Sequence, residues 1–340
     1  MQTMRAIVVE KAGAAFTLVE RKIPQPGPDE ILIQIEACGV CHSDLFVKEG
    51  IFPGLEYPRI PGHEVVGRVA KCGKNVKIWE KDQRVGIGWH GGHCLECEAC
   101  RRGNFIHCEK AKITGIHFDG GYAEYLVAPS EAIVKIPEEL NSAEAAPLLC
   151  AGVTTFNALR NSSARPGDII AVQGIGGLGH LAIQYANKLG YEVVAISQGS
   201  KKKKLAKRLG AHHYLDSNVQ QVTEELQKMG GAKIILATAP NGSAMSTLID
   251  GLSVKGTMIV IGVAGDLIKV SPTQLITGQK SIKGWPSGDA KASEDTLYFS
   301  SLQNIMPKIE TYPLERASEA YQQMINNKAQ FRAVLTMNES

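Results

Sequence analysis

The stretch Asp168-Ile-Ile-Ala-Val-Gln-Gly174-Ile-Gly176-Gly-Leu-Gly179 decides the fold of the second half of this chain. Its apolar run Ile169–Gln173 predicts a buried strand, and G-x-G-x-x-G follows directly and opens a helix expected near Gly177. A glycine pattern in that context is the fingerprint of a dinucleotide-binding turn. Gly174 permits the tight turn, Gly176 the approach of a pyrophosphate and Gly179 close helix–strand contact. The backbone N–H groups of Gly176, Gly177, Leu178 and Gly179 would face the phosphates.

Strands and helices alternate after this turn. The runs that predict strands are Ile169–Gln173, Glu192–Ser197, His213–Asp216, Lys233–Ala237, Thr257–Gly262 and Ser281–Gly284. The helical stretches between the first five are His180–Leu189, Lys202–Leu209, Val219–Met229 and Ala244–Leu252. This alternation predicts a doubly wound parallel sheet of the Rossmann type over residues 151–288.

The first 130 residues have a different texture. Short β-branched runs separated by Gly and Pro clusters predict a barrel-like β domain; the runs are Arg5–Val9, Ile31–Glu36, Val65–Ala70, Arg84–Ile87 and Ala123–Val127. Asn141, with Glu144 three residues later, marks a helix start. Two helices and a strand end the chain (Ser293–Gln303, Leu314–Asn327 and Arg332–Thr336), and we expect them to pack back on the first domain. The predicted domains are thus 1–150 with 289–340, and 151–288.

Four cysteines stand close together at Cys94, Cys97, Cys100 and Cys108. The spacing C-x2-C-x2-C-x7-C allows four thiolates to enclose one tetrahedral Zn²⁺ with no open position. Arg101, Arg102 and Lys110 would offset the thiolate charge. Unligated thiols and an iron–sulfur cluster are the alternatives, although the spacing differs from the ferredoxin patterns.

A second candidate metal site consists of Cys41, His63 and Cys150. Two cysteines, one histidine and a free fourth position form the ligand set known for the catalytic zinc of alcohol dehydrogenases. The pattern Gly62-His-Glu-x2-Gly67-x5-Gly73-x2-Val76 resembles the zinc signature of the medium-chain dehydrogenase/reductase superfamily at every fixed position. The resemblance runs nearly from end to end and is strongest to bacterial and cinnamyl-alcohol-type enzymes, through Gly-Val-Cys-His-Ser-Asp44 and Gly88-Trp-His-Gly-Gly-His93.

This resemblance implies a GroES-like catalytic domain with two zinc ions per chain and an active cleft between the domains. Cys41, His63 and Cys150 would hold the catalytic zinc, with Glu64 close to it. Asp44 would accept a hydrogen bond from His63 and fix its orientation. The remaining roles implied are Ser43 as hydrogen-bond partner of the reacting oxygen, His42 as pyrophosphate contact and Trp89 as pocket wall.

One position departs from many relatives, and one segment bears on the choice of cofactor. Phe46 stands where many carry the histidine that ends the proton relay, so water would complete the relay, or the enzyme would work mainly as an aldehyde reductase. After the second predicted strand, Ser197-Gln-Gly-Ser200-Lys-Lys202 lacks the acid that binds the ribose of NAD. Serines and lysines suit a 2′-phosphate, so Ser197, Ser200 and Lys202 favour NADP(H) over NAD(H).

The sequence therefore predicts reversible hydride transfer between a primary alcohol or aldehyde and the cofactor. A sugar-alcohol or secondary-alcohol dehydrogenase is the nearer alternative; a non-catalytic, zinc-stapled NADPH-binding protein is the alternative from another class. A net charge of +3 gives no reason to expect nucleic-acid binding. We see neither a signal peptide nor a membrane span, and expect a cytoplasmic homo-oligomer, a tetramer or a dimer.

Overall fold

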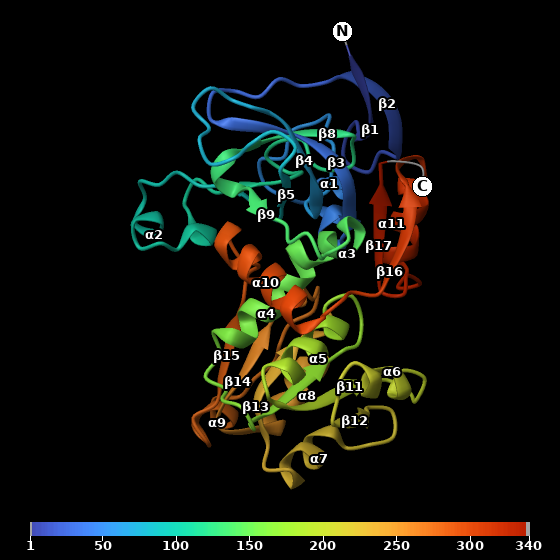
Figure 1. The fold of residues 1–340 in the computed structure, drawn as a ribbon. Coiled ribbons are helices and arrows are strands. Elements are labelled where there is room, and N and C mark those ends of the chain that lie inside the picture. The colour runs from blue at the N-terminus through green and yellow to red at the C-terminus, as the bar shows by residue number, and fades with distance from the viewer. Residues whose placement is uncertain (1, 338–340) are drawn as a thin grey trace. The chain divides into compact units, whose positions relative to one another are not determined.

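A computed structural model describes residues 2–337, and the chain divides into two compact units. One unit comprises Met1–Val153 with Ser287–Ser340, and the other comprises Thr154–Pro286. Figure 1 labels their elements. The units are described separately below.

The second unit is built on a six-stranded sheet in which every neighbouring pair is parallel. Its strands are β10 (Ile169–Gln173), β11 (Glu192–Ser197), β12 (His213–Asp216), β13 (Ala232–Ala237), β14 (Leu252–Val260) and β15 (Ser281–Gly284). Their order in the sheet, β12-β11-β10-β13-β14-β15, is that of a dinucleotide-binding fold. The predicted doubly wound parallel sheet is therefore confirmed.

Helices lie before the first of these strands and between the later ones. They are α4 (Val153–Arg160), α5 (Gly179–Lys188), α6 (Lys203–Arg208), α7 (Val222–Lys228), α8 (Gly242–Leu248), η5 (Ile249–Gly251) and α9 (Pro272–Ile276). Helix α5 begins at Gly179, two residues after the expected start near Gly177 and one residue before the expected stretch His180–Leu189, because the glycine loop runs on through Leu178. Buried residues such as Val194, Leu226 and Ile235 form the core.

The first unit is built on a seven-stranded mixed sheet. Its strands are β3 (Glu30–Val40), β4 (Val65–Cys72), β5 (Arg84–Ile87), β8 (Tyr125–Pro129), β9 (Val134–Lys135), β16 (Ile309–Pro313) and β17 (Arg332–Thr336). Strands β1 (Thr3–Val9) and β2 (Phe16–Lys22) form a separate antiparallel pair, as do β6 (His90–Gly92) and β7 (Lys112–Ile113). The C-terminal β17 pairs with β3 and so joins the N-terminal part of the chain in one sheet.

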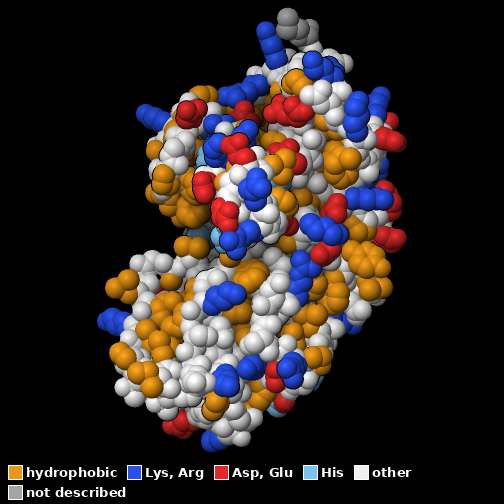
Figure 2. Space-filling model, turned by 90° about the vertical axis from the view of Figure 1, so that its left-hand side faces the viewer, with side chains coloured by type: hydrophobic (Ala, Val, Ile, Leu, Met, Phe, Trp, Pro, Cys, Tyr) orange, Lys and Arg blue, Asp and Glu red, His pale blue; other side chains and the backbone are white. Residues whose placement is uncertain are grey.

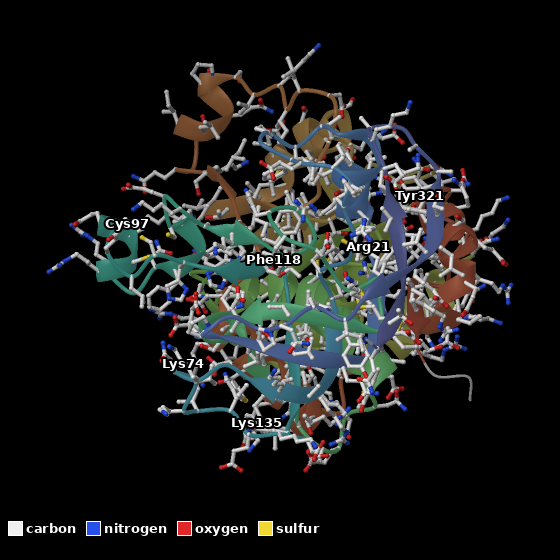
Figure 3. All side chains as sticks on the ribbon, turned by 90° about the horizontal axis from the view of Figure 1, so that it is seen from above. Arg21, Lys74, Cys97, Phe118, Lys135 and Tyr321 are labelled. Carbon is white, nitrogen blue, oxygen red and sulfur yellow. The ribbon has the colours of Figure 1, made fainter. Side chains whose placement is uncertain are left out.

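Short helices of the first unit lie between and beside these strands. They are η1 (His42–Asp44), α1 (Leu45–Glu49), α2 (Glu98–Arg101), η2 (Phe105–His107), η3 (Ser130–Ala132), α3 (Ser142–Pro147), η4 (Leu148–Gly152), α10 (Ala290–Gln303), η6 (Leu314–Arg316) and α11 (Ala317–Ile325). Asn141 caps α3, accepting a hydrogen bond from the N–H of Ala143 at 2.8 Å as the sequence indicated. Seen from above in Figure 3, Cys97 and Tyr321 lie on opposite sides of this unit.

The distribution of surface charge and the lengths of the helices are relevant to binding of nucleic acid or membranes. Basic and acidic side chains are interspersed on the face shown in Figure 2, in line with the small net charge of +3. None of the helices within residues 2–337 combines the length and the apolar character that crossing a bilayer requires.

The register between β3 and β4 depends on one glycine. Gly67 lies opposite Ile35, and a Cβ there would stand 2.1 Å from the carbonyl oxygen of Gln34. Such an approach is possible only without a side chain, so the glycine of the zinc signature allows β4 to pack tightly on β3.

We predict that Gly67→Ala lowers the free energy of unfolding by about 1–3 kcal/mol, because backbone atoms must separate to admit the methyl group. Gly284→Ala is the matched control, since it also changes a strand glycine but has open space around the added Cβ. Urea denaturation of both zinc-loaded variants measures the effect. Equal midpoints for the two would contradict the argument.

Candidate metal centres and cofactor loop

The antiparallel pair β3–β4 brings the first two predicted metal ligands together. Cys38 of β3 lies opposite Val65 of β4, so the end of one strand meets the start of the other. Cys41 directly follows β3, and His63 precedes β4 by two residues. Gly39 donates its N–H to the carbonyl oxygen of Glu64 at 2.9 Å and fastens the two segments at this point.

Cys150 reaches the same place from a wide helical turn. It lies in η4, a π-helix that continues α3. Such turns occur preferentially at functional sites, since one extra residue per turn changes the direction of a side chain. Gly88 directly follows β5 and lets the π-helix pack close to the chain there, because a Cβ on Gly88 would be 2.5 Å from the carbonyl oxygen of Leu149.

Ligand atoms of Cys41, His63, Glu64 and Cys150 all lie within 4.8 Å of one another. The sulfur atoms of Cys41 and Cys150 are 3.7 Å apart. Two sulfurs about 2.3 Å from a tetrahedral zinc would be about 3.8 Å apart, so the donor set fits this ion. Cys41, His63 and Glu64 are buried, and Cys150 is partly exposed.

The orientation of His63 leaves one of its nitrogens for a metal. Nδ1 lies 3.3 Å from Oδ1 of Asp44, in a pair whose side chains are 3% and 1% exposed. Nε2 is buried and has no hydrogen-bond partner among residues 2–337. A buried, unsatisfied imidazole nitrogen beside two thiols is the pattern that metal ligation explains.

The protonation of the cluster follows from these contacts. The hydrogen bond from Cys150 and the neighbouring His63 hold the pKa of Cys41 well below its usual range. The same bond to Cys41, together with burial, raises the pKa of Cys150. One thiolate thus forms readily at Cys41, which favours capture of a cation.

Glu64 has a partner that sequence reasoning missed. Its Oε1 accepts a hydrogen bond from Nη2 of Arg332, the first residue of β17, and both side chains are buried. Its Oε2 has no partner among the described residues. Burial raises the pKa of Glu64 to about 7, against the opposing effect of Arg332. The only sequence signal was a charged residue at the start of an otherwise apolar strand.

An aromatic wall flanks His63, formed by Phe46, Phe52 and Trp89. The ring of Trp89 stands nearly perpendicular to that of His63, with centroids 5.0 Å apart. Phe46 and Phe52 have centroids 6.3 and 6.4 Å from that of Trp89. Sequence reasoning singled out Phe46 and Trp89 but not Phe52, which only the fold brings to them.

The two other residues of the Cys-His-Ser-Asp segment lie in the short helix η1. His42 is exposed and Ser43 is partly exposed. Asp44, by contrast, is buried, and its Oδ2 accepts hydrogen bonds from the N–H of Cys41 and the hydroxyl of Tyr122, each at 2.8 Å.

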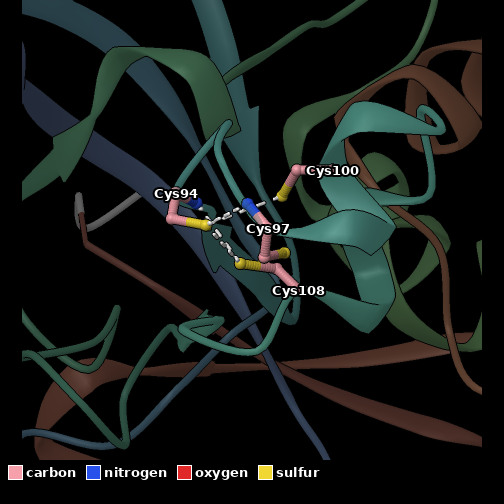
Figure 4. A group of neighbouring side chains, drawn as sticks. All are labelled: Cys94, Cys97, Cys100 and Cys108. Carbon is pink, nitrogen blue, oxygen red and sulfur yellow. Dashed lines mark hydrogen bonds between the residues drawn. The ribbon is translucent and has the colours of Figure 1, made fainter.

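The four-cysteine lobe, residues 94–108, forms the second group of potential ligands, and Figure 4 shows its side chains converging. The sulfur of Cys94 lies 4.0 Å from that of Cys100 and 3.5 Å from that of Cys108. These separations bracket the roughly 3.8 Å of a tetrahedral zinc–thiolate site. Backbone N–H groups of Cys94 and Lys110 each lie 3.3 Å from the sulfur of Cys108, which stabilises negative charge there.

The glycine loop has the expected geometry in the second unit. Gly174 has a φ of +94°, and a Cβ at Gly179 would lie 1.9 Å from the carbonyl oxygen of Gly174. A Cβ at Gly176 would meet nothing within 4 Å, so its surface is open to a ligand. These are the three conditions that a dinucleotide-binding turn imposes on its glycines.

The segment 197–202 lies beside this loop. Nζ of Lys202 donates to the carbonyl oxygen of Ile175 at 2.7 Å, and burial lowers the pKa of this lysine. Ser197 ends β11, and Ser200 is exposed. Sequence reasoning missed Asp216, whose Oδ1 accepts from the N–H groups of Gly199 and Asn218 at 2.8 and 3.0 Å. Its charge is directed to the protein backbone.

Comparisons with known proteins agree with both units. The family model "Alcohol dehydrogenase GroES-like domain" matches residues 27–138, and "Zinc-binding dehydrogenase" matches residues 177–301. Alcohol dehydrogenase patD of Penicillium expansum is 46% identical over 98% of each chain.

Solved structures give the same result. A cinnamyl alcohol dehydrogenase from Sorghum bicolor is similar with a TM-score of 0.89, 28% identity and full coverage of both chains. The cinnamyl alcohol dehydrogenase of Helicobacter pylori, solved with NADP(H), has a TM-score of 0.89 and 26% identity over 99% of each chain.

The chain therefore belongs to the zinc-dependent alcohol dehydrogenases of the medium-chain dehydrogenase/reductase superfamily. It is an oxidoreductase of the alcohol dehydrogenase and aldehyde reductase type, with a GroES-like and a Rossmann-type part as the sequence predicted.

The buried pair of Glu64 and Arg332 generates a prediction. Arg332→Met should cost about 3–5 kcal/mol of stability, because the buried carboxyl group of Glu64 loses its partner and must either stay charged and unpaired or take up a proton. Adding Glu64→Gln should restore part of the loss. Arg68→Met is the control, because it removes an arginine whose pair with Glu36 is partly exposed and contributes about 1 kcal/mol or less. Equal losses for Arg332→Met and Arg68→Met in urea denaturation would refute the assignment.

Proposed function

We propose that this enzyme interconverts primary alcohols, aliphatic or aromatic, and their aldehydes with NADP(H) as the favoured cofactor. The observation that carries the proposal is the buried convergence of Cys41, His63, Glu64 and Cys150, whose ligand atoms lie within 4.8 Å of one another. In the proposal Cys41, His63 and Cys150 hold a catalytic zinc ion. Cys94, Cys97, Cys100 and Cys108 hold a second, structural one.

A zinc ion bound there supplies a Lewis acid that lowers the pKa of an alcohol hydroxyl and polarises an aldehyde carbonyl. Asp44 keeps Nδ1 of His63 engaged, so the imidazole presents Nε2. Arg332 holds one oxygen of Glu64, and the other oxygen has no hydrogen-bond partner among the described residues. In this proposal Ser43 donates or accepts the hydrogen bond at the reacting oxygen, and His42 contacts the cofactor pyrophosphate.

The aromatic wall supports an unhindered, apolar substrate. Trp89 presents its ring edge-on to His63, and Phe46 and Phe52 pack edge-on against Trp89. A polyol would have to leave its additional hydroxyl groups unpaired against such a surface, which is costly. The alternative of a sugar-alcohol dehydrogenase is therefore less well supported. Because Phe46 cannot carry a proton, we propose that water ends the relay, or that aldehyde reduction is the main direction.

The preference for NADP(H) rests on the segment 197–202 together with the missing acid after β11. Ser197, Ser200 and Lys202 would contact the 2′-phosphate, while Gly174, Gly176, Gly177, Leu178 and Gly179 would enclose the pyrophosphate. Asp216 is the nearby carboxylate, and its bonds to two backbone N–H groups reduce its repulsion of a phosphate. The Helicobacter pylori relative, which holds NADP(H), is consistent with this preference.

We further propose a homo-oligomer, tetramer or dimer, in the cytoplasm, with a catalytic domain of residues 1–150 and 289–340 and a cofactor domain of residues 151–288. Strand β15 is an edge of its sheet, and the apolar side chains of Val263, Leu267 and Ile276 are exposed in the same unit. A second copy of the chain would cover such a surface. None of the eight cysteines forms a disulfide bond, which is compatible with a reducing compartment.

Metal analysis tests the zinc assignment. The wild-type enzyme should contain two zinc ions per chain, and Cys41→Ala should contain one, fold normally and lose turnover, since only the catalytic ion loses a ligand. Cys72→Ala, at a partly buried cysteine outside both clusters, should keep two zinc ions and its activity. An active Cys41→Ala enzyme would overturn the proposal.

Cofactor kinetics test the second part. We expect a higher kcat/KM with NADPH than with NADH. Lys202→Ala should lower the value for NADPH by about tenfold, the loss of one charge-assisted hydrogen bond, and change that for NADH much less. Lys204→Ala, at an exposed lysine two residues further on, serves as control. A wild-type preference for NADH would exclude the assignment.

A further inference from the structure

Tyr122 is a buried residue that neither the zinc signature nor the proposed chemistry uses. It lies in the bend before β8 and has no solvent exposure. Burial and the neighbouring Asp44 raise its pKa well above the usual value, so its hydroxyl carries a proton to donate. The hydroxyl of Tyr122 donates a hydrogen bond to Oδ2 of Asp44 at 2.8 Å.

This hydrogen bond determines how the carboxylate of Asp44 is turned. Oδ2 has two donors, the N–H of Cys41 and the hydroxyl of Tyr122, each at 2.8 Å. The other oxygen, Oδ1, then faces Nδ1 of His63 at 3.3 Å. Without the tyrosine hydroxyl, one backbone N–H would remain to fix the rotation of the carboxylate.

The ring of Tyr122 also supports the segment that carries His63. Gly62 has a φ of +102°, and a Cβ there would lie 2.5 Å from Cδ1 of Tyr122. The N–H of Tyr122 donates to the carbonyl oxygen of Pro61 at 2.9 Å, and that of Gly121 donates to the carbonyl oxygen of Gly62 at 2.9 Å. The tyrosine therefore contacts the Cys41 segment through Asp44 and the His63 segment through its ring and backbone.

We propose that Tyr122 is a positioning residue of the catalytic metal centre: its hydroxyl fixes the carboxylate of Asp44 so that His63 presents Nε2 to zinc. The inference rests on the proposed zinc site. In this inference Tyr122 helps to retain the zinc ion and does not contact the substrate. Groups that orient a histidine ligand contribute about 10–100-fold to metal affinity or activity. Because Tyr122 acts through Asp44, we expect about a threefold to tenfold effect on zinc release.

The test compares zinc release from Tyr122→Phe with release from the wild-type holoenzyme, using a colorimetric chelator. The ion that Cys41→Ala lacks should leave about threefold to tenfold faster in Tyr122→Phe. The ion of the four-cysteine lobe should leave at the wild-type rate and provides an internal control. With Co²⁺ in the catalytic site, the visible absorption bands should shift in Tyr122→Phe, because the ligand geometry changes.

Tyr321→Phe is the matched control. Tyr321 is 4% exposed, packs on the same Phe16 ring as Tyr122, and its hydroxyl has no hydrogen-bond partner within residues 2–337. Its removal should leave zinc release and the cobalt spectrum unchanged. Thermal unfolding of both variants separates a general loss of stability from an effect on the metal centre.

A double-mutant cycle tests whether Tyr122 acts through Asp44. In an Asp44→Asn background, Tyr122→Phe should add little to the rate of zinc release; independent, multiplying effects would overturn the inference. Wild-type release and an unchanged cobalt spectrum in Tyr122→Phe would also overturn it while leaving the zinc site intact. If Cys41→Ala loses no zinc, the proposed site itself fails, and that result is distinct from the other two.

Discussion

The antiparallel contact between the end of β3 and the start of β4 is the constraint on which the first unit depends. It places Cys41 and His63 at one end of two neighbouring strands, where the geometry of the sheet fixes their separation. Gly67 makes the contact close, and the N–H of Gly39 fastens its end to Glu64. A metal centre built next to the ends of strands gains rigidity from them, because sheet hydrogen bonds anchor the backbone just before Cys41 and just after His63.

Side chains from distant parts of the sequence complete this centre. Cys150 comes from a π-helix, Arg332 from the last strand and Tyr122 from the bend before β8. Each pairs with one buried group that would otherwise lack a partner: Cys150 with Cys41, Arg332 with Glu64, and Tyr122 with Asp44. A buried polar group without a partner is costly. The result is a cluster of four potential ligand residues in which Nε2 of His63 and Oε2 of Glu64 have no hydrogen-bond partner among the described residues.

Local patterns predicted much of the fold. The ends of β5, β10, β11, β12, β15 and β17 were predicted to the residue, since short runs with apolar or β-branched residues are punctuated there by turn or charged residues. Strand β2 was missed since Phe16–Lys22 carries three charged side chains and lies largely at the surface. The cysteine and histidine positions followed from spacing and resemblance. By contrast, Arg332 is separated from Glu64 by 268 residues, and no local pattern encodes such a partnership.

Because Cys150 lies in a π-helical turn, the direction of its thiol depends on the number of residues in the turn as well as on their identity. A helix rotates by about 100° per residue, so removing one residue between Leu148 and Gly152 would swing every later side chain by that angle. Substitutions that keep the turn wide preserve the direction of the thiol, whereas a deletion that restores an ordinary α-helix redirects it. A change of chain length in this π-helix would therefore redirect the thiol of Cys150 even where the altered position touches no ligand.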